Sequence, residues 1–344
     1  MEDLDMLDIG RSPSQIRKDP ISGRWVIISK DRAKRPHDWL AETGNESGNH
    51  CPFCLGNENL TPSEIFAIRD GGTLPNSPGW KIRVVSNKFP ALQMDDDLNF
   101  RDEGIFSMIN GFGTHEVLIE SPEHLIDLAD LSIEHIRDIF WIFRERYIDL
   151  KRDDRFKYIL VFKNHGNAAG ASLRHPHSQI IALPIIPKRV MEELTGALEY
   201  YNERAHCIFC DLIQHEIQHS SRIVISHSKF IAFEPYAARF PFETWILPTE
   251  HFDRFEDITY DDCFELALII KQTLQRLNDS LNKPPYNLIV HSSPLHDEKS
   301  LSYHWHIELI PKLANIAGFE WGAGFYINTI PPEEAACVLR NSKI

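Results

Sequence analysis

The chain has 344 residues, of which 42% are apolar and 10% aromatic, enough for one large domain or two smaller ones. Its net charge of −14 argues against nucleic-acid and membrane partners, because nothing offsets repulsion from phosphates over the whole surface. No apolar run reaches the length of a membrane span, and residues 1–15 lack the pattern of a signal peptide. We therefore expect a cytoplasmic protein whose six cysteines are thiols or metal ligands rather than disulfides.

One basic run interrupts this acidic sequence. Residues 30–36 read Lys-Asp-Arg-Ala-Lys-Arg-Pro. A solvated basic turn is the interpretation that the run alone favours, and an arm that binds an anion is the functional alternative.

Two similar halves follow one another along the chain. Each half has a Cys-x-x-Cys pair, at 51–54 and 207–210, and each closes on a His-x-His segment, at 175–177 and 304–306. The features between these motifs recur in the same order, which indicates an internal duplication. The step from Phe162 to His175 and the step from His291 to His304 are both 13 residues.

The elements between the motifs also match. Apolar residues at helical spacing predict a helix from near Ser132 to Leu150 and a second helix over 263–281, and a strand follows each, at 158–162 and 287–290. A further helix is expected over 191–203 as the link. The pattern predicts two α+β units with antiparallel sheets. Cys263, on an apolar stripe, and Cys337, in an apolar C-terminal segment, are expected to be buried thiols.

The cysteine pairs predict two metal sites, because a Cys-x-x-Cys pair with two later histidines has the composition of a tetrahedral zinc site. The first-half candidates are Cys51, Cys54, His115 and His175. The second-half candidates are Cys207, Cys210, His251 and His304. The rival interpretation of the first pair is a thioredoxin-like redox motif, which should lie in a βαβ setting that this pattern lacks.

The second histidine of the first half is a candidate nucleophile. If the segment is a strand, residues 175, 177 and 179 share one face. With His175 bound to metal, His177 is left as a neutral imidazole that could attack phosphorus. Gln179 and Ser172 could donate to phosphoryl oxygens, and the small residues around Gly170 could approach a phosphate closely. Two histidines merely hydrogen-bonded on a half-buried strand are the alternative.

Five motifs carry a resemblance to a known family. They are Asp-Pro-Ile-Ser-Gly-Arg-Trp-Val at 19–26, Arg-Ala-Lys-Arg-Pro at 32–36, the first cysteine pair, Asn-Lys-Phe-Pro at 87–90 and His-Pro-His-Ser-Gln at 175–179. Together they resemble the galactose-1-phosphate uridylyltransferases, a branch of the histidine triad superfamily, over most of the chain. The resemblance implies two tandem histidine-triad-like α+β domains, which we place at 1–190 and 191–344.

The resemblance also implies a double displacement. His177 would attack the α-phosphorus of a nucleoside diphosphate sugar, release a sugar 1-phosphate and leave a nucleotidyl-histidine, which a second phosphate then attacks. Gln179 and Ser172 would hold phosphoryl oxygens, and Gln179, where histidine triad hydrolases carry histidine, favours transfer over hydrolysis. Other implied binding residues are Asn164, Arg32, Arg35, Asn87, Phe89 and, in a partly matched hexose-phosphate segment, Phe319. The resemblance further implies a homodimer that shares active-site residues.

Two points stay open at this stage. In well-known uridylyltransferases the matching second metal site would be Glu193, His291, His304 and His306, whereas the Cys207 pair resembles the ADP-glucose phosphorylase branch. The first interpretation is galactose-1-phosphate uridylyltransferase, an enzyme of galactose metabolism. ADP-glucose phosphorylase, which uses inorganic phosphate, is the alternative, and a non-catalytic, zinc-stabilised nucleotide-binding protein is an alternative of another class.

Overall fold

A computed structural model describes residues 15–23, 25–28, 51–94 and 98–343. Its centre is a ten-stranded sheet with the order β10-β11-β12-β14-β13-β8-β9-β7-β4-β3. The first half supplies β3 (Glu64–Arg69), β4 (Trp80–Ser86), β7 (Thr114–Ile119), β8 (Tyr158–His165) and β9 (His177–Leu183). The second half supplies β10 (Ile223–Ser226), β11 (Phe230–Phe233), β12 (Thr244–Pro248), β13 (Tyr286–His291) and β14 (His306–Pro311). Every neighbouring pair in this sheet is antiparallel, which confirms the α+β fold class.

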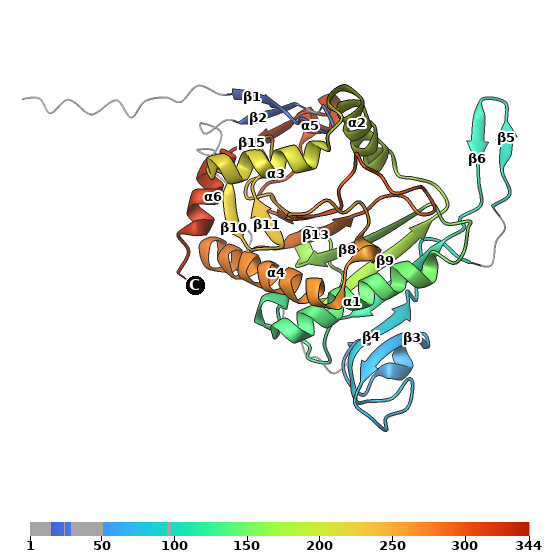
Figure 1. The fold of residues 1–344 in the computed structure, drawn as a ribbon. Coiled ribbons are helices and arrows are strands. Elements are labelled where there is room, and N and C mark those ends of the chain that lie inside the picture. Colours follow the sequence, from blue (N-terminus) through green and yellow to red (C-terminus); the bar gives the residue numbers. More distant parts are fainter. Residues whose placement is uncertain (1–14, 24, 29–50, 95–97, 344) are drawn as a thin grey trace, which may run out of the picture.

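Helices cover both faces of the sheet (Figure 1). On one face α1 (Ile133–Leu150) packs against α4 (Tyr260–Leu281), and both bury apolar stripes in the main core. The Ser132 hydroxyl caps α1, and Thr259 forms a capping box with Asp262 at α4. On the other face, α2 (Lys188–Arg204) and α3 (Ile208–His219) enclose a smaller apolar cluster against the second-half strands. The predicted helices are confirmed.

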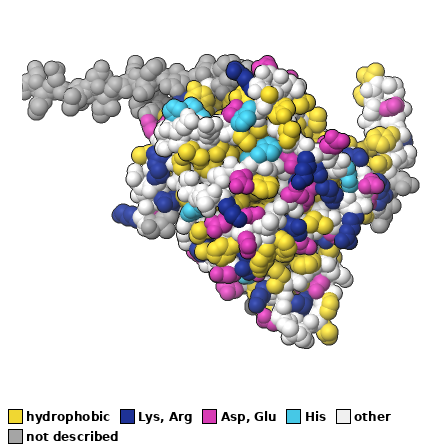
Figure 2. All heavy atoms as spheres, in the orientation of Figure 1, with side chains coloured by type: hydrophobic (Ala, Val, Ile, Leu, Met, Phe, Trp, Pro, Cys, Tyr) yellow, Lys and Arg dark blue, Asp and Glu magenta, His cyan; other side chains and the backbone are white. Residues whose placement is uncertain are grey.

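Smaller elements complete the fold. A three-stranded sheet joins β1 (Gln15–Lys18), β2 (Trp25–Ile28) and β15 (Tyr326–Asn328), and a hairpin of β5 (Arg101–Glu103) and β6 (Phe106–Met108) projects from the body (Figure 1). The other elements are α5 (Gly318–Ala323), α6 (Pro332–Arg340) and the 3-10 turns η3 (Glu58–Leu60), η4 (Leu128–Asp130), η5 (Asn167–Ala169) and η6 (Phe255–Asp257). Acidic and basic side chains are interspersed with apolar ones on the face in Figure 2.

The two halves meet where β8 pairs with β13, so one sheet runs through both. Strand register corrects the sequence alignment of the repeat. Phe162 lies opposite Gln179 in the first half, and Ile289 lies opposite Glu308 in the second. Because Gln179 and Glu308 each follow their His-x-His segment at the same distance, Phe162 corresponds to Ile289 and not to His291. The equal 13-residue steps were therefore misleading. The domain boundary at residue 190 stays a prediction.

Two further expectations have different outcomes. Cys263 is buried in α4, as predicted, but Cys337 is exposed on α6, because that helix turns this position outward. Across the part of the chain that the structure describes, every helix is too short or too polar to span a bilayer.

Candidate active site and metal centres

The first metal-type group lies where the loop after Cys51 meets the strand ends of the first half. The ligand atoms within 4.8 Å of one another belong to Cys51, Cys54, His124 and His175. Cys54 Sγ lies 3.2 Å from His124 Nδ1 and 3.6 Å from His175 Nδ1. His175 Nε2 donates to the Ser121 carbonyl at 2.7 Å, which fixes the ring with Nδ1 toward the sulfur. These donors fit a tetrahedral zinc ion with no open position.

The predicted fourth ligand of this group, His115, is wrong. His115 lies on β7 opposite Ile181, four residues along the strand from Ile119, which lies opposite His177. Its ring therefore reaches Gln179 of β9 and not the cysteines. His124, beyond the end of β7, takes the ligand position. A signal for it exists in the sequence, because Glu123-His124 corresponds to Glu250-His251 in the second half.

His115 instead orients Gln179. The Ala91 N–H donates to His115 Nδ1 at 3.3 Å, so the proton is on Nε2, which donates to Gln179 Oε1 at 2.7 Å. With its oxygen occupied, the Gln179 amide presents its N–H groups as donors. Asn87 Nδ2 lies 3.1 Å from His115 Nε2, and the Asn87 side chain accepts from the Phe89 N–H at 2.9 Å. The structure therefore joins three predicted site residues through His115.

The second metal-type group has the predicted members. Within 4.8 Å of one another lie ligand atoms of Cys207, Cys210, His251 and His304. Cys210 Sγ is 3.5 Å from His251 Nδ1 and 3.8 Å from His304 Nδ1. The Nε2 atoms of these rings donate at 3.0 Å to the carbonyls of Ser300 and Pro248. The orientation repeats that of the first half, with Nδ1 left for the metal, and this group also fits zinc.

Hydrogen bonds and burial shift the pKa values of thiols in both groups. The bond from Cys210, followed by those from His251 and His304, lowers the pKa of Cys207 to about 2 despite its burial. Burial, with Cys51 beside it, raises the pKa of Cys54 to about 11. The bond with Cys207, together with burial, also raises the pKa of Cys210. Since the thiolate is the form that binds metal, a metal ion has to displace a tightly held proton from one thiol in each group.

His177 begins β9, two residues after the metal-type ligand His175. It is 6% exposed, and its Nδ1–H donates to the His175 carbonyl at 2.8 Å. Burial lowers its pKa below the usual histidine value. Phe53 lies between Cys51 and Cys54 in the sequence. Its ring contacts the His177 ring edge-on, with 5.4 Å between the ring centroids. His177 is therefore a neutral imidazole with an unprotonated Nε2 at pH 7, as a nucleophile requires.

The remaining predicted residues of the first half surround the turn after β8. Asn164 Oδ1 accepts from Asn287 Nδ2 at 2.8 Å, and the Asn164 Nδ2 lies 3.7 Å from where a Cβ on Gly170 would stand. Gly170 has a left-handed φ of +91°, which favours glycine. Ser172 is exposed in the following turn.

Four predicted residues remain, of which the structure describes two. Phe89 is 83% exposed, as an open platform would be. Phe319 belongs to α5 and is 49% exposed. Its ring centroid lies 6.5 Å from that of Phe325. Arg32 and Arg35 lie outside the described residues.

A third buried group occupies the second-half position that corresponds to the candidate active site. Its members are Glu193, His291, His306 and Glu308. His291 Nδ1 is 3.1 Å from Glu193 and its Nε2 is 3.5 Å from Glu308, which also pairs with Arg239 at 2.6 Å. The alternative ligand set predicted for the second metal is Glu193, His291, His304 and His306. The structure divides this set, because His304 lies with Cys207 and Cys210 and the other three lie in the third group. Glu308 is not among the predicted residues, and its signal in the sequence is its correspondence to Gln179.

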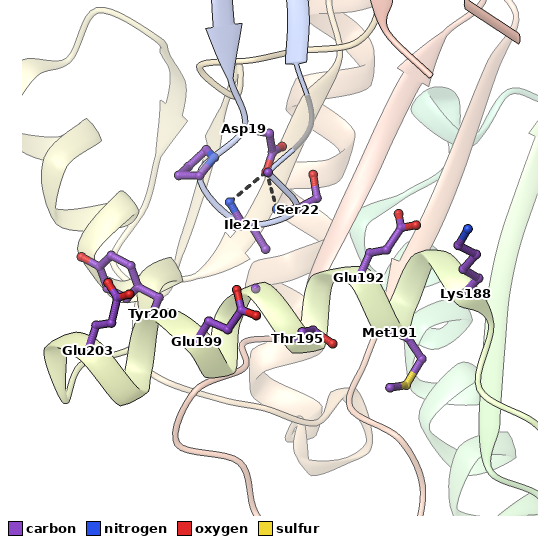
Figure 3. Close-up of a pocket in the computed structure, with 13 residues that line it drawn as sticks. Asp19, Ile21, Ser22, Lys188, Met191, Glu192, Thr195, Glu199, Tyr200 and Glu203 are labelled. Carbon is purple, nitrogen blue, oxygen red and sulfur yellow. Dashed lines mark hydrogen bonds between the residues drawn. The ribbon is translucent and has the colours of Figure 1, made fainter. Parts of the chain in front are cut away.

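A groove of ≈ 570 Å³ lies between the β1–β2 turn and α2 (Figure 3). The Asp19 carboxylate accepts from the Ile21 and Ser22 N–H groups at 2.9 and 2.8 Å, which fixes the turn. A Cβ on Gly196 would lie 1.6 Å from the Ile21 carbonyl, so only glycine permits this contact. The acidic side chains on the α2 wall are Glu192, Glu199 and Glu203. Because this wall repels phosphate, we locate the candidate active site at His177.

The fold and the site together define a tandem α+β protein with two Cys2His2 groups, one of them beside a neutral, nucleophile-type histidine. Models for the N-terminal and C-terminal domains of galactose-1-phosphate uridyl transferase match residues 5–187 and 193–340. The chain belongs to the galactose-1-phosphate uridylyltransferase family and is an enzyme of its nucleotidyl-transferring class.

Similar proteins carry two different names. ADP-glucose phosphorylase from Arabidopsis thaliana is 38% identical over 95% of this chain and 92% of its own length. Galactose-1-phosphate uridylyltransferase from Thermotoga maritima is 29% identical over 96% of this chain and 99% of its own. A crystal structure of the Arabidopsis thaliana phosphorylase with bound ADP-glucose matches 96% of this chain and 100% of that one, with a TM-score of 0.84 and 38% identity. A uridylyltransferase structure matches with a TM-score of 0.74 and 29% identity, over 95% and 98%.

Proposed function

We propose that this enzyme transfers a nucleoside monophosphate from a nucleoside diphosphate sugar to a phosphate acceptor through His177. The observation that carries the proposal is the bond from His177 Nδ1–H to the His175 carbonyl. It holds the tautomer whose Nε2 lone pair is available, on a backbone that the adjoining Cys2His2 group fixes. His306 makes the same bond in the second half, but the Glu308 carboxylate follows it where the Gln179 amide follows His177. The amide donor therefore distinguishes His177 as the nucleophile.

The reaction has two displacements. His177 Nε2 attacks the α-phosphorus, the bond from that phosphorus to the bridging oxygen breaks, and sugar 1-phosphate leaves with the electron pair. An oxygen of the acceptor phosphate then attacks the same phosphorus, and the N–P bond breaks to return the neutral imidazole and release a new nucleotide. The acceptor is a sugar 1-phosphate or inorganic phosphate.

The neighbouring residues have roles in this proposal. The amide N–H groups of Gln179 and Asn164 and the Ser172 hydroxyl donate to phosphoryl oxygens as charge develops on them. Gly170 lets the backbone approach, and the exposed ring of Phe89 stacks on the base, next to Asn87. Further contacts to nucleotide, phosphate or sugar are proposed for Arg32, Arg35 and Phe319.

Two zinc ions are proposed as structural cofactors. The first would be held by Cys51, Cys54, His124 and His175. The second would be held by Cys207, Cys210, His251 and His304. When bound, zinc supplies cross-links between a loop and the strand ends, with no open position for chemistry. A homodimer and a cytoplasmic location are proposed on the family resemblance and the cysteine usage alone.

Two nucleotides have comparable support. Uridylyl transfer, with galactose 1-phosphate as acceptor, is supported by the family models and by the 29% identical relative. Adenylyl transfer, with inorganic phosphate as acceptor, is supported by the 38% identical phosphorylase and by its ADP-glucose complex. The base decides between them, so the test must report which nucleotide becomes attached.

Intact mass after incubation with UDP-glucose or ADP-glucose provides that report. We expect a single added UMP or AMP that disappears in His177→Asn and persists in the matched variant His306→Asn. Galactose 1-phosphate or inorganic phosphate is then added, and the compound that removes the adduct is the acceptor. An adduct that survives in His177→Asn would overturn the assignment, and no adduct with either sugar nucleotide would favour the non-catalytic alternative.

A further inference from the structure

Three polar side chains are buried together directly behind the nucleophile. Lys163 of β8 and Ser178 of β9 are each 2% exposed, and Glu120, which follows β7, is 0% exposed. Lys163 Nζ donates to Glu120 Oε2 at 2.7 Å, and the Ser178 hydroxyl donates to Glu120 Oε1 at 2.5 Å. One carboxylate therefore ties together three neighbouring strands. We call these three residues the buried triad.

The buried triad is connected to the backbone that carries His177. Lys163 Nζ also donates to the His177 carbonyl at 3.4 Å, and the Glu120 N–H donates to the Pro176 carbonyl at 3.0 Å. Ser178 is the next residue along the strand. Because side chains alternate across a strand, the His177 ring points to the opposite face from Ser178. The triad thus holds residues 176–178 from behind while the imidazole faces the candidate active site.

The second half has apolar residues at the same three positions. Since Phe162 corresponds to Ile289 and Gln179 to Glu308, Lys163 corresponds to Val290 and Ser178 to Ile307. Both Val290 and Ile307 are fully buried.

The same reasoning locates the third position. Val117 lies opposite Gln179, and Trp245 lies opposite Glu308. By this register Glu120, one residue past the end of β7, corresponds to Pro248. The equivalent bonds from His175 and His304 to the carbonyls of Ser121 and Pro248 match it to Leu247 instead. Both residues are apolar and buried. All three members of the buried triad have apolar counterparts in the repeat.

Stability does not explain this difference between the halves. Removing two charges from water costs several kcal/mol per ion, and apolar side chains of similar volume often serve as well or better. The second half shows that this sheet can hold apolar side chains at these three positions. What distinguishes the first half is the nucleophile in front of the triad, and a misplacement of about 1 Å can cost on the order of 10² in rate.

We propose that Glu120, Lys163 and Ser178 are positioning residues that hold the His177 backbone so that its Nε2 stays aimed at the phosphorus. This inference rests on the proposed function. His135 supports the triad from α1, because its Nε2 donates to the Glu120 carbonyl at 2.6 Å. None of the three needs to touch the substrate.

The test gives the first half the apolar character of the second, with the combined variant Glu120→Leu, Lys163→Val and Ser178→Ile. We measure the single-turnover rate of adduct formation over a range of sugar-nucleotide concentrations. The expected result is a rate at saturation lower by on the order of 10², with half-saturation at the wild-type concentration and the urea midpoint near wild type. An unchanged rate at saturation would overturn the proposal.

Two single substitutions at Ser178 test the proposal in case the combined variant does not fold. Ser178→Ala removes one bond to Glu120 and is expected to slow adduct formation about tenfold, whereas Ser178→Thr keeps the hydroxyl and restores the rate. If alanine and threonine at this position are equally slow or equally fast, the proposal is wrong.

The buried pair Arg146–Glu116 is the matched control. Arg146 Nη2 of α1 lies 2.7 Å from Glu116 Oε1 of β7, and the two side chains are only 7% and 5% exposed. Glu116→Leu with Arg146→Met should leave both the urea midpoint and the rate near wild type, and a rate loss equal to that of the triad variants would indicate general loosening instead. Wild-type protein that forms no adduct would refute the proposed function itself, a result distinct from all of these.

Discussion

The two halves place a second histidine in the same position and surround it differently. His177 has the amide of Gln179 beside it, oriented by His115. His306 stacks on His291 at 4.6 Å and on Trp245 at 5.1 Å, and Glu308 stands where Gln179 stands in the first half. Both histidines donate Nδ1–H to the carbonyl two residues earlier. The His-x-His strand motif thus fixes the histidine tautomer in both halves. The side chains around each ring determine whether it can act as a nucleophile.

Charge makes the second position unsuitable for phosphate. Glu308 is buried against Arg239, which also pairs with Glu243 at 2.7 Å. The guanidinium that could have met an anion is already neutralised by two carboxylates. Repetition of a fold therefore does not repeat its chemistry, because one change from an amide to a carboxylate reverses the charge that a ligand meets.

Loss of a metal ligand is the largest expected difference from wild type in both halves. Structural zinc contributes on the order of 10–16 kcal/mol of apparent binding energy, so Cys54→Ser and Cys210→Ser should each lose one zinc and melt at a much lower temperature. Only Cys54→Ser should also slow adduct formation in the protein that remains folded, because Phe53 and His175 contact His177. Zinc analysis, thermal unfolding and intact mass check this. Full zinc content in Cys210→Ser would exclude that residue as a ligand.

The buried charges of the second half should matter for stability alone. Arg239→Met leaves the carboxylates of Glu243 and Glu308 buried without their cation, which should cost about 3–5 kcal/mol in urea unfolding. Adding Glu308→Gln should recover part of the loss. The more exposed pair Arg155–Asp153 is the control, and Arg155→Met should cost at most about 1 kcal/mol. Equal losses for the two arginines would contradict the distinction between buried and exposed pairs.

Exchange of the residues at positions 179 and 308 tests the comparison directly. Gln179→Glu places a carboxylate against the phosphoryl oxygens and should slow adduct formation by on the order of 10²–10³. Glu308→Gln should leave that rate unchanged. Single-turnover mass measurements on both variants are sufficient. If Gln179→Glu retained the wild-type rate, Gln179 could not be a donor to the transferred group.

Much of the fold was predictable because local rules agree with the tertiary structure. Ser132 caps the helix that its position predicts, and the apolar stripe ending at Leu281 is the buried face of α4. The second Cys2His2 group was predictable because its histidines, His251 and His304, both follow features that recur in the two halves.

The missed residues depend on strand register, which spacing alone does not specify. His115 and His124 both follow Cys54 at plausible distances, and only the pairing of β7 with β9 shows that His115 lies beside Gln179, away from the strand end at which His175 and the sulfur lie. The correspondence of Glu308 to Gln179 likewise needed the pairing of β13 with β14. The sequence contained these residues, but the loop between β8 and β9 is shorter than that between β13 and β14, which hides the alignment.

The smallest expected effect is on pH dependence. Burial lowers the pKa of His177, and the neutral ring is the nucleophile, so the active fraction declines only when the pH falls through a value below about 6.5, the usual histidine pKa. The adduct rate should therefore be highest near pH 8 and decrease towards low pH with a midpoint below about 6.5. Single-turnover rates between pH 5 and 8, with unfolding followed in parallel to exclude acid denaturation, check this. A midpoint above 6.5 would mean that His177 is held in a more solvated or more anionic environment than its buried position beside Lys163 provides.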